Sequence, residues 1–451
     1  MITEVSITNF KSIEGIRGLK LKPLTLFTGV NSSGKSNILA AISFFAEASR
    51  VGEIVGTNQV QLSNVYTQSD VRKYPYQELE KFIAYKGRKK KLVELEINIK
   101  PTSMLVRNIS DSLTKELRQY IPELNDMTKI GSVGYTFSFN FESPQPLYFQ
   151  RILINERVLM SVCQKATPHA SIEDPKTLRG TGVAGSASSL FADQTFAPLS
   201  PEDAPIVQPL SKVARSILVY IRERVKMMYF VSGERGRIDP EVRVDAGGGF
   251  EPTWIGHNGQ FLIEILSRCL TRQPEETKKI REWAKRFQLP EMRVGYIGRN
   301  TLEANFTDDS TGAKLNSALA GLGSRQILSV ITQIFLAKRG SVIMIEEPEI
   351  SLHPENQVLL HELFSEAISG GKQIICSTHS PFFVLALSKI IKKKQLTVDK
   401  IAVYHVTKDS KGTHIEPLKL NEHGFLATGV PSFMNVEKEL FHDWSESLEE
   451  E

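Results

Sequence analysis

The stretch GVNSSGKS, residues 29–36, matches the pattern G-x-x-x-x-G-K-S. It follows an apolar run at 24–27 that predicts a strand, and it precedes apolar residues at helical spacing from Ile38 to Phe45. Glycines let such a loop wrap closely around phosphates, and the start of the next helix adds partial positive charge. The stretch therefore predicts a phosphate-binding loop in an α/β fold. The alternative is a glycine-rich turn with an exposed lysine, which would require neither the strand nor the helix.

Two side chains of this loop indicate which phosphate compound it binds. An ammonium at Lys35 can bridge the β- and γ-phosphates of a nucleotide. A hydroxyl at Ser36 can bind the Mg²⁺ that accompanies those phosphates. The sequence therefore predicts ATP and Mg²⁺ as cofactors.

A second stretch, SVIMIEEPEISLHP at residues 341–354, places two carboxylates directly after an apolar run. The run at 342–345 predicts a strand buried on both faces of a parallel sheet. Adjacent carboxylates at its end repel each other and are costly to bury without positive charge. A bound Mg²⁺–nucleotide removes that cost, so we expect Glu346 at the metal and Glu347 at the attacking water. Two solvated acids at a capped strand end are the alternative.

The stretch CSTHS, residues 376–380, ends the next apolar strand. We expect this strand to neighbour the strand at 342–345, which would bring His379 to the γ-phosphate. A zinc site built from His353, His361 and His379 is the competing interpretation, but the chain contains no HExxH spacing.

A glycine-rich turn runs into an amphipathic helix in NSALAGLGSRQILSVITQIFLA, residues 316–337. The start of this helix, with Gly321, Gly323 and Ser324, could bind a second phosphate.

Together these motifs resemble the ABC-type ATPase heads of the SMC, RecF and OLD (overcoming lysogenisation defect) group. ITNFKSIEGI and LTLFTGVNSSGKSNIL are similar to that group's opening, IMIEEPEISLHP to its Walker B segment with D-loop, and CSTHSPFF to its switch-histidine segment. LAGLGSRQ lies where the signature belongs and is a degenerate form of LSGGQ. The resemblance implies an α/β fold: an ABC-type P-loop ATPase head, with a mixed sheet, helices, an antiparallel β-subdomain and an inserted helical region.

The resemblance also implies roles for single residues. Ser36 and Glu346 would hold the metal, and Glu347 and His379 would act in catalysis. Nucleotide binding would fall to Asn31, Ser33, Gly34, Lys35, Ser36 and Asn37, and Gly321, Gly323 and Ser324 would contact the ATP of a second subunit. Asn9, Lys11 and Ser12 would line the base and ribose side, and Gln68 is the best candidate for a Q-loop.

Patterns elsewhere suggest how the chain is divided. Alternations at 93–99 and 135–141 predict an antiparallel sheet at the surface of the core, and helical patterns cover 211–228 and 259–287. We expect five regions: 1–163, the N-terminal part of the head with Walker A and the β-subdomain; 164–208, a mobile Gly/Ser/Pro/Ala-rich loop; 209–300, an inserted mainly helical region; 301–435, the C-terminal part with signature, Walker B, D-loop and switch histidine; and 436–451, an acidic tail.

Composition narrows the possible classes of protein and the compartment in which this chain works. The chain has 451 residues, 41% of them hydrophobic, and a formal net charge of +4 that is too balanced to indicate nucleic-acid binding. Basic runs at 86–91 and 389–394 are the local exceptions. Three widely spaced cysteines form no CxxC pair, which favours a reducing compartment. Because we find no signal peptide and no apolar run long enough to cross a bilayer, we expect a cytoplasmic protein with no membrane partner.

The resemblance implies that two heads sandwich ATP, and hence a homodimer or higher homo-oligomer. Too few residues follow His379 for a TOPRIM nuclease domain, so we expect no DNA cleavage by this chain. It is most similar to nuclease-free ATPase subunits of bacterial phage-defence operons, of the Septu and PARIS types. We therefore expect an ATP-hydrolysing sensor or regulatory subunit for a separate effector protein, a nuclease or toxin. A RecF-like DNA-binding ATPase in repair is the main alternative, and a membrane-transport ATPase subunit is the other.

Overall fold

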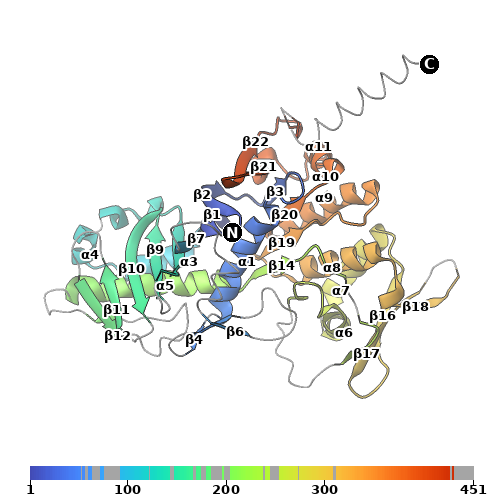
Figure 1. Cartoon of the computed structure of the whole chain (residues 1–451), viewed down its shortest axis with the longest axis horizontal. Coiled ribbons are helices and arrows are strands. Elements are labelled where there is room, and N and C mark those ends of the chain that lie inside the picture. Colours follow the sequence, from blue (N-terminus) through green and yellow to red (C-terminus); the bar gives the residue numbers. More distant parts are fainter. Residues whose placement is uncertain are drawn as a thin grey trace, which may run out of the picture. The chain divides into compact units, whose positions relative to one another are not determined.

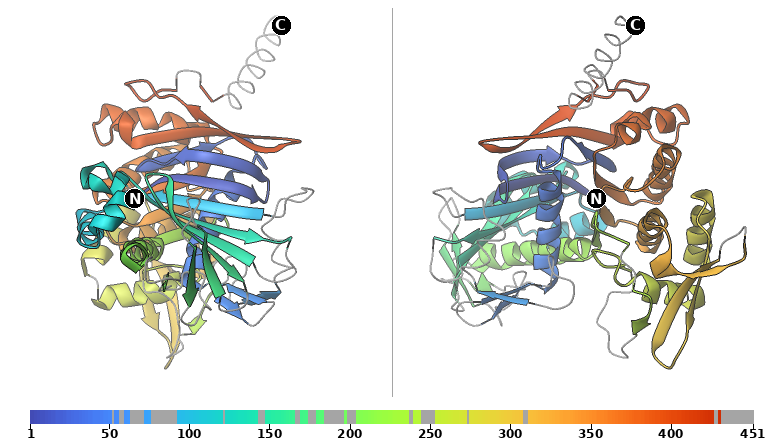
Figure 2. Two further views of the ribbon diagram at one scale, coloured as in Figure 1. Left: turned by 90° about the vertical axis from the view of Figure 1, so that its left-hand side faces the viewer. Right: turned by 45° about the vertical axis from the view of Figure 1, so that its right-hand side comes forward.

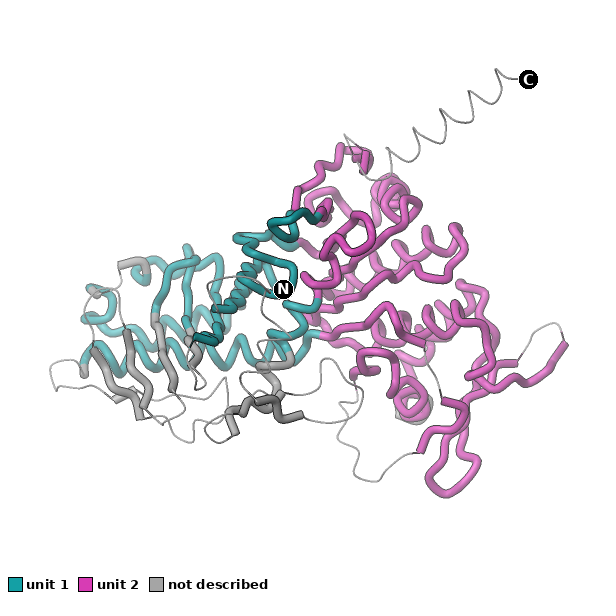
Figure 3. Tube along the Cα trace, in the orientation of Figure 1, with its two compact units in different colours: residues 1–21, 40–228, 408–414 teal, residues 22–39, 229–407, 415–451 magenta. Residues whose placement is uncertain are grey.

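The computed structural model describes residues 1–51, 53–55, 59–62, 72–75, 92–120, 122–142, 147–165, 169–173, 179–183, 196–197, 204–236, 239–243, 253–272, 274–307, 311–426 and 429–430. The chain forms two compact units, coloured separately in Figure 3. Unit 1 comprises residues 1–21, 40–228 and 408–414, and unit 2 comprises residues 22–39, 229–407 and 415–451. Each unit is therefore assembled from segments that are distant in the sequence.

Unit 2 is built on a six-stranded sheet in the order β14-β19-β20-β3-β21-β22 (Figure 1). The strands are β3 (Leu24–Thr28), β14 (Met228–Val231), β19 (Val342–Glu346), β20 (Gln373–Thr378), β21 (Ile401–Asp409) and β22 (Gly412–Leu418). β19, β3 and β21 pair with their neighbours in parallel, with Ile343 opposite Ile374 and Ile374 opposite Leu24. β3 and β20 are buried along their whole length, as their apolar sequences predict.

The parallel pairing fixes where the chemistry-bearing motifs lie. β19 and β3 both pair with β20, so the predicted adjacency of the strands at 342 and 373 is confirmed. Parallel strands end at the same edge of a sheet, and ligands of open α/β sheets bind at that carboxyl edge. The loop after β3, the glutamates after β19 and the histidine after β20 therefore share one edge.

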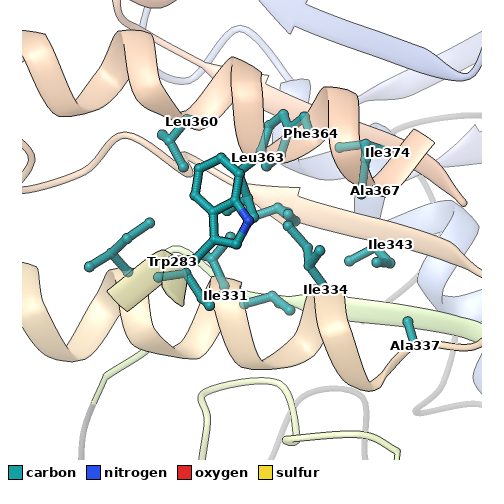
Figure 4. Packing of buried hydrophobic residues seen from close by; sticks show 14 of the residues in the cluster. Trp283, Ile331, Ile334, Ala337, Ile343, Leu360, Leu363, Phe364, Ala367 and Ile374 are labelled. Carbon is teal, nitrogen blue, oxygen red and sulfur yellow. The ribbon is translucent and has the colours of Figure 1, made fainter. Parts of the chain in front are cut away.

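Helices of unit 2 bury apolar side chains against this sheet. Figure 4 shows Ile331 and Ile334 of one helix facing Leu360 and Leu363 of another, with Trp283 beside them. The helices of this unit are α6 (Leu262–Arg272), α7 (Pro274–Arg286), α8 (Leu322–Leu336), α9 (Pro354–Ser369), α10 (Pro381–Leu385) and α11 (Leu387–Lys392).

A smaller sheet in unit 2 consists of β15 (Val242–Arg243), β16 (Glu291–Tyr296), β17 (Thr301–Thr307) and β18 (Lys314–Asn316). The single helical pattern predicted at 259–287 proves to be two helices, α6 and α7. Pro274, which lacks a backbone N–H, begins the second of them. The range 209–300 also contributes β14 to the six-stranded sheet, so it is not purely helical.

Unit 1 is dominated by a nine-stranded antiparallel sheet in the order β13-β12-β11-β10-β9-β8-β7-β1-β2 (Figure 2). Its strands are β1 (Ile2–Phe10), β2 (Ile13–Lys20), β7 (Leu92–Ile99), β8 (Val133–Asn140), β9 (Leu147–Ile154), β10 (Arg157–Lys165), β11 (His169–Glu173), β12 (Arg179–Val183) and β13 (Phe196–Ala197). The short strands β4 (Glu53–Val55), β5 (Gln59–Leu62) and β6 (Arg72–Pro75) form a third sheet. The helices are α1 (Lys35–Val51), which starts in unit 2, α3 (Ser103–Asp111), α4 (Lys115–Tyr120) and α5 (Ala204–Val225).

The two alternating stretches pair with each other as β7 and β8, which confirms the predicted antiparallel sheet. The aromatic face of β8 packs on α1, with the rings of Phe139 and Phe44 6.2 Å apart. The polar face does not lie at the surface as expected, because Thr136 and Ser138 are buried. Thr136 donates a hydrogen bond to Glu96 on β7, so polar cross-strand partners take the place of water on that face.

Several predictions fall on residues outside the described ranges: the Q-loop candidate Gln68, the basic run 86–91 and the acidic tail 436–451. The predicted loop 164–208 contains β11, β12, β13 and the start of α5, and its remaining central residues lie outside those ranges as well. Within the part of the chain that the structure describes, no helix is long and apolar enough to span a membrane.

Candidate active site

The loop after β3 has a backbone that only glycine permits at one point. Gly29 has φ +150°, and a Cβ there would lie 2.2 Å from the carbonyl oxygen of Val406 on β21. Gly34 has φ +107°, another conformation that other residues rarely adopt. Helix α1 starts directly afterwards, at Lys35. The predicted strand, loop and helix are thus present, with the first backbone N–H groups of α1 at the end of the loop.

The Lys35 side chain is buried inside this loop, with 4% of its surface exposed. Its ammonium donates to the carbonyl oxygens of Gly29 and Val30, at 2.8 and 2.7 Å, and lies 3.3 Å from the Ser33 hydroxyl. Burial lowers the pKa of Lys35 to about 8, although Glu347 and Glu349 oppose the shift. An anion at the loop would stabilise the charged form, so this cradle fits a phosphate group.

The glutamate pair stands where β19 ends. Glu346 accepts a hydrogen bond from the backbone N–H of Gly233, at 3.3 Å, and Glu347 has the unusual φ of +43°. The Glu347 N–H donates to the carbonyl of Ser377 on β20, at 3.0 Å, which ties the turn to the neighbouring strand. Both carboxylates are partly exposed, so neither is sealed in the core and each can reach a ligand at the edge.

His379 connects the loop to the glutamates. Its Nδ1 lies 3.4 Å from the Lys35 ammonium, and its Nε2 lies 3.3 Å from Glu347 Oε1. Burial and the charge of Lys35 lower the pKa of His379, which favours the neutral imidazole at pH 7. Because the ammonium can only donate, Nδ1 is the acceptor and the Nε2 proton faces Glu347. Three side chains that are distant in the sequence therefore form one chain of contacts.

Two further residues of the site were not predicted as functional, and the first is Arg235. It follows β14, and only 1% of its surface is exposed. Its guanidinium donates to the carbonyl oxygens of Glu346 (2.6 Å) and Glu347 (2.9 Å), and its Nε donates to that of Gln326 on α8 (3.2 Å). Burial lowers its pKa to about 10, against the effect of the nearby glutamates, so it stays charged at pH 7.

Arg235 offsets part of the repulsion between the adjacent glutamates. A fixed cation behind the turn compensates their negative charge even before a ligand adds its own. The sequence signal was the stretch SGERGR at 232–237, but nothing in it indicates that Arg235 folds inward.

The second unpredicted residue is Glu349, which is 6% exposed. Its Oε1 accepts from the Thr378 hydroxyl, at 2.6 Å, and from the backbone N–H of His379, at 3.0 Å. Burial raises the pKa of this carboxyl. Glu349 thus fixes the backbone from which His379 projects.

The predicted metal residues lie at the same edge of the sheet. The Ser36 side chain is exposed at the first turn of α1, and the Glu346 carboxylate is partly exposed at the end of β19. A hydroxyl and a carboxylate are oxygen donors of the kind that Mg²⁺ prefers, with phosphate oxygens and water completing its shell. The donor set therefore fits the metal. Asn31 is exposed and Asn37 is partly exposed in the same loop and helix start.

The turn before α8 lies apart from these contacts. Gly321 is the N-cap of α8 and makes no side-chain cap. Gly323 approaches Ser351 so closely that a Cβ would lie 2.5 Å from the Ser351 carbonyl oxygen. Within the described residues, the hydrogen bonds of Lys35 and His379 reach neither of these glycines nor Ser324. Gly321 is exposed, and Gly323 and Ser324 are partly exposed.

The three histidines of the zinc alternative have separate roles. His361 is fully buried and its Nε2 contacts the Phe383 carbonyl oxygen at 2.5 Å, while His353 caps α9. His379 faces Lys35 and Glu347. The described part of the chain contains no group of three or more His, Cys, Asp or Glu side chains arranged for a metal.

The fold and the phosphate loop define the class of protein: an α/β P-loop protein, with the strand, loop and helix that the sequence predicts. Residues 1–155 and 262–384, more than half of the chain, match the AAA ATPase domain family, and the chain belongs to that family.

Among solved structures, the chain is similar to three SMC head domains. One is an SMC head bound to the C-terminal winged-helix domain of ScpA: 13% identity, 93% of this chain, 98% of that chain, TM-score 0.47. Another is the SMC head domain from Thermotoga maritima, at 11% identity over 93% of this chain and 99% of that chain, with a TM-score of 0.39. The third is the Smc head domain with an extended coiled coil, bound to the C-terminal domain of ScpA, from Pyrococcus furiosus. It is 12% identical over 97% of this chain and 99% of that chain, with a TM-score of 0.41. No curated protein sequence matches the chain.

Proposed function

We propose that this chain binds and hydrolyses ATP at the edge formed by the loop after β3, the end of β19 and the end of β20. The observation that carries the proposal is the contact chain from Lys35 through His379 to Glu347. Lys35 would hold the phosphates, and Glu347 would orient and deprotonate the attacking water. His379, neutral and held by the Glu349 carboxylate through its backbone, would donate a hydrogen bond across the site. Bound at Ser36 and Glu346, Mg²⁺ would neutralise charge on the phosphate oxygens.

This hydrolysis proposal is tested by phosphate release from ATP with Mg²⁺ present and with the metal removed by a chelator. We expect turnover with Mg²⁺ and none without it. Turnover that survives chelation would contradict the metal assignment to Ser36 and Glu346.

The turn before α8 supports pairing of two heads. Gly321 and Leu322, which open α8, and the nearby Leu319 are exposed, Leu319 by 77% and Leu322 by 48%. Exposed apolar side chains suit contact with a second copy of the chain, and the adjacent helix N-terminus suits the phosphates of the ATP bound to that copy. We infer that ATP joins two copies, with Gly321, Gly323 and Ser324 contacting the nucleotide of the partner.

Sedimentation of Glu347→Gln protein tests this pairing, because slow hydrolysis preserves the ATP-bound form. We expect a monomer-to-dimer shift on adding Mg²⁺–ATP, and Ser324→Arg in the same background should abolish the shift while leaving ATP binding intact. If Ser324→Arg dimerises normally, the nucleotide sandwich through α8 is wrong.

We further propose that the chain regulates a separate effector protein, a nuclease or toxin, in anti-phage defence. Helix α10 begins directly after His379 and Ser380, and it exposes Phe382 by 54% and Leu385 by 55%. A protein docked on α10 would therefore contact the segment that carries the histidine of the site. This position supports regulation of an effector by the state of the ATP site.

Affinity purification of tagged Glu347→Gln protein from its native cell, with Mg²⁺–ATP present, tests the effector. We expect a stoichiometric unrelated protein in the eluate and its loss in the double variant Phe382→Ser, Leu385→Ser. An eluate without any such protein would contradict the effector role.

One observation favours a second candidate, a DNA-binding ATPase. Lys389, Lys392, Lys393 and Lys394 are exposed on and just after α11, although Lys393 pairs with Glu362 at 2.7 Å. DNA binding through six or more phosphates would weaken about 10³-fold or more between 50 and 200 mM salt. Absence of DNA binding at 50 mM salt would eliminate this candidate.

A further inference from the structure

Unit 2 encloses a cavity of about 370 Å³ away from the glutamates and the phosphate loop. Its walls come from α6, α7, α8, β16 and β17. Inside it is apolar: Leu266, Ile280, Phe306 and Leu328 line it and are each at most 5% exposed. Cavities of roughly 300 to 1,000 Å³ with apolar walls and a few polar groups are typical of small-molecule sites.

Three polar side chains of the cavity lie on one face of α7. Thr277, Arg281 and Lys285 follow one another at intervals of four residues, so they form a row along the helix. The Thr277 hydroxyl is buried and has no hydrogen-bond partner among the described residues. A buried hydroxyl without a partner is costly, which points to a ligand atom that bonds to it.

Charge decides what kind of polar group the ligand carries. Arg281 and Lys285 are exposed at the rim of the cavity. Glu291 is the one acidic residue of the lining and pairs with Arg293 at 3.2 Å, so the charged side chains that line the cavity carry a net positive charge. Inside, burial and, to a lesser degree, the charge of nearby Glu276 raise the pKa of the Cys269 thiol to about 11, which keeps it uncharged. The arrangement suits an anion at the rim and an apolar body within.

From these features we propose that the cavity binds a small amphipathic acid, with a single apolar tail among Leu266, Phe306 and Leu328 and its anionic group at Thr277, Arg281 and Lys285. A wholly apolar ligand would leave the Thr277 hydroxyl unpaired. A nucleotide would place several charges against apolar walls.

A ligand in this cavity would touch the helix that joins it to the ATP site. Leu328 of α8 lines the cavity, and two residues earlier the Gln326 carbonyl accepts from Arg235, at 3.2 Å. Arg235 also holds the carbonyls of Glu346 and Glu347. Occupancy that shifts α8 therefore acts on the backbone of the glutamate turn, which makes the acid a regulator of turnover. This regulatory half rests on the proposed ATPase function, whereas the binding half does not.

Calorimetric titration of nucleotide-free protein with octanoate, nonanoate and decanoate, below the concentration of micelle formation, tests the binding half. Each methylene that enters the cavity should tighten Kd by about fourfold. Decyltrimethylammonium, which has the same tail and the opposite charge, should not bind. Decyl phosphate compares the two anionic head groups, and tail-dependent binding of either anion supports the proposal. No binding of either, or equal binding of the cation, would overturn it.

Variants at the rim test the site without disturbing the core. Arg281→Gln should weaken decanoate binding by about tenfold, since a charge-assisted hydrogen bond is lost. Lys278→Gln removes the same charge from an exposed position of α7 outside the cavity lining and should leave binding unchanged. Equal effects of the two substitutions would place the acid elsewhere.

ATP turnover with and without decanoate then tests the regulatory half. We expect turnover to change severalfold in the wild-type protein and in Lys278→Gln, and to respond only at about tenfold higher decanoate in Arg281→Gln. Binding with unchanged turnover would overturn regulation through α8. Loss of turnover in every sample, with binding intact, would count against the ATPase function alone.

Discussion

The edge of the six-stranded sheet and the turn before α8 carry the two phosphate motifs of the sequence, and they differ sharply. At the sheet edge, Lys35 and Arg235 are buried and each donates several hydrogen bonds within the chain. At the turn, Gly321 is exposed and provides no side-chain cap to its helix. The first region is prearranged by the fold, whereas the second presents an open surface. This difference agrees with the proposed function, in which one chain supplies the hydrolytic residues and the turn before α8 contacts the nucleotide bound to a second copy.

The strongest challenge to a prearranged edge is removal of Arg235. Arg235→Ala removes a buried donor from the carbonyls of Glu346, Glu347 and Gln326. We expect a loss of about 3 kcal/mol or more in unfolding free energy, measured by urea titration. Arg293→Ala, at an exposed position, is the control and should cost less than 0.5 kcal/mol or so. Similar values for both would show that Arg235 does not support the turn.

Lys35 tests whether the edge is built for phosphate. Lys35→Ala removes the buried ammonium, and we expect ATP binding to weaken about 10²-fold or more. Equilibrium binding of a fluorescent ATP analogue measures this effect. Lys338→Ala, an exposed lysine just after α8, should bind as the wild type does. Unchanged binding by Lys35→Ala would contradict the loop assignment.

His361 is a buried histidine outside the proposed ATP site, and its titration predicts how stability depends on pH. Burial lowers its pKa from 6.5 to about 4. The folded protein therefore binds fewer protons than the unfolded chain between these values, and stability falls as pH drops from 6.5 towards 4. The loss should be about 3 kcal/mol. His361→Gln keeps a donor for the Phe383 carbonyl and cannot titrate, so its stability should fall less on acidification. Parallel pH profiles would show that other groups dominate.

The smallest expected effect is the difference in unfolding free energy between alanine substitutions at the two glycines of the turn. At Gly323 a Cβ would lie 2.5 Å from the Ser351 carbonyl oxygen, whereas at Gly321 nothing lies within 4 Å. Gly323→Ala should therefore cost about 1–3 kcal/mol in thermal or urea unfolding, and Gly321→Ala less than about 1 kcal/mol. If Gly321→Ala costs as much as Gly323→Ala, the turn is not the open surface described above.

Sequence reasoning predicted the sheet edge well because its signals are local. The pattern at 29–36 fixes a strand, a loop and a helix within one stretch, and the runs before Glu346 and His379 predict buried parallel strands. Parallel strands end at a common edge, so the meeting of Lys35, Glu347 and His379 follows from the topology.

The missed features depend on contacts over long sequence separations. Arg235 is 111 residues from Glu346 along the chain, and no spacing rule links a charged residue after β14 to that turn. The buried polar face of β8 was also missed, because alternation shows that two faces differ but not what covers the polar one. The break between α6 and α7 could have been predicted, since Pro274 marks it in the sequence.

ATP hydrolysis at the sheet edge is tested most sharply by ATP binding and ATP turnover of Glu347→Gln, with Glu355→Gln as the matched control from the start of α9. The amide keeps the size of the side chain but cannot accept a proton from water. We predict ATP binding within a fewfold of the wild type and turnover slower by about 10²-fold or more, while Glu355→Gln stays at the wild-type rate. Turnover of Glu347→Gln at the wild-type rate would contradict hydrolysis of ATP at this edge through Glu347.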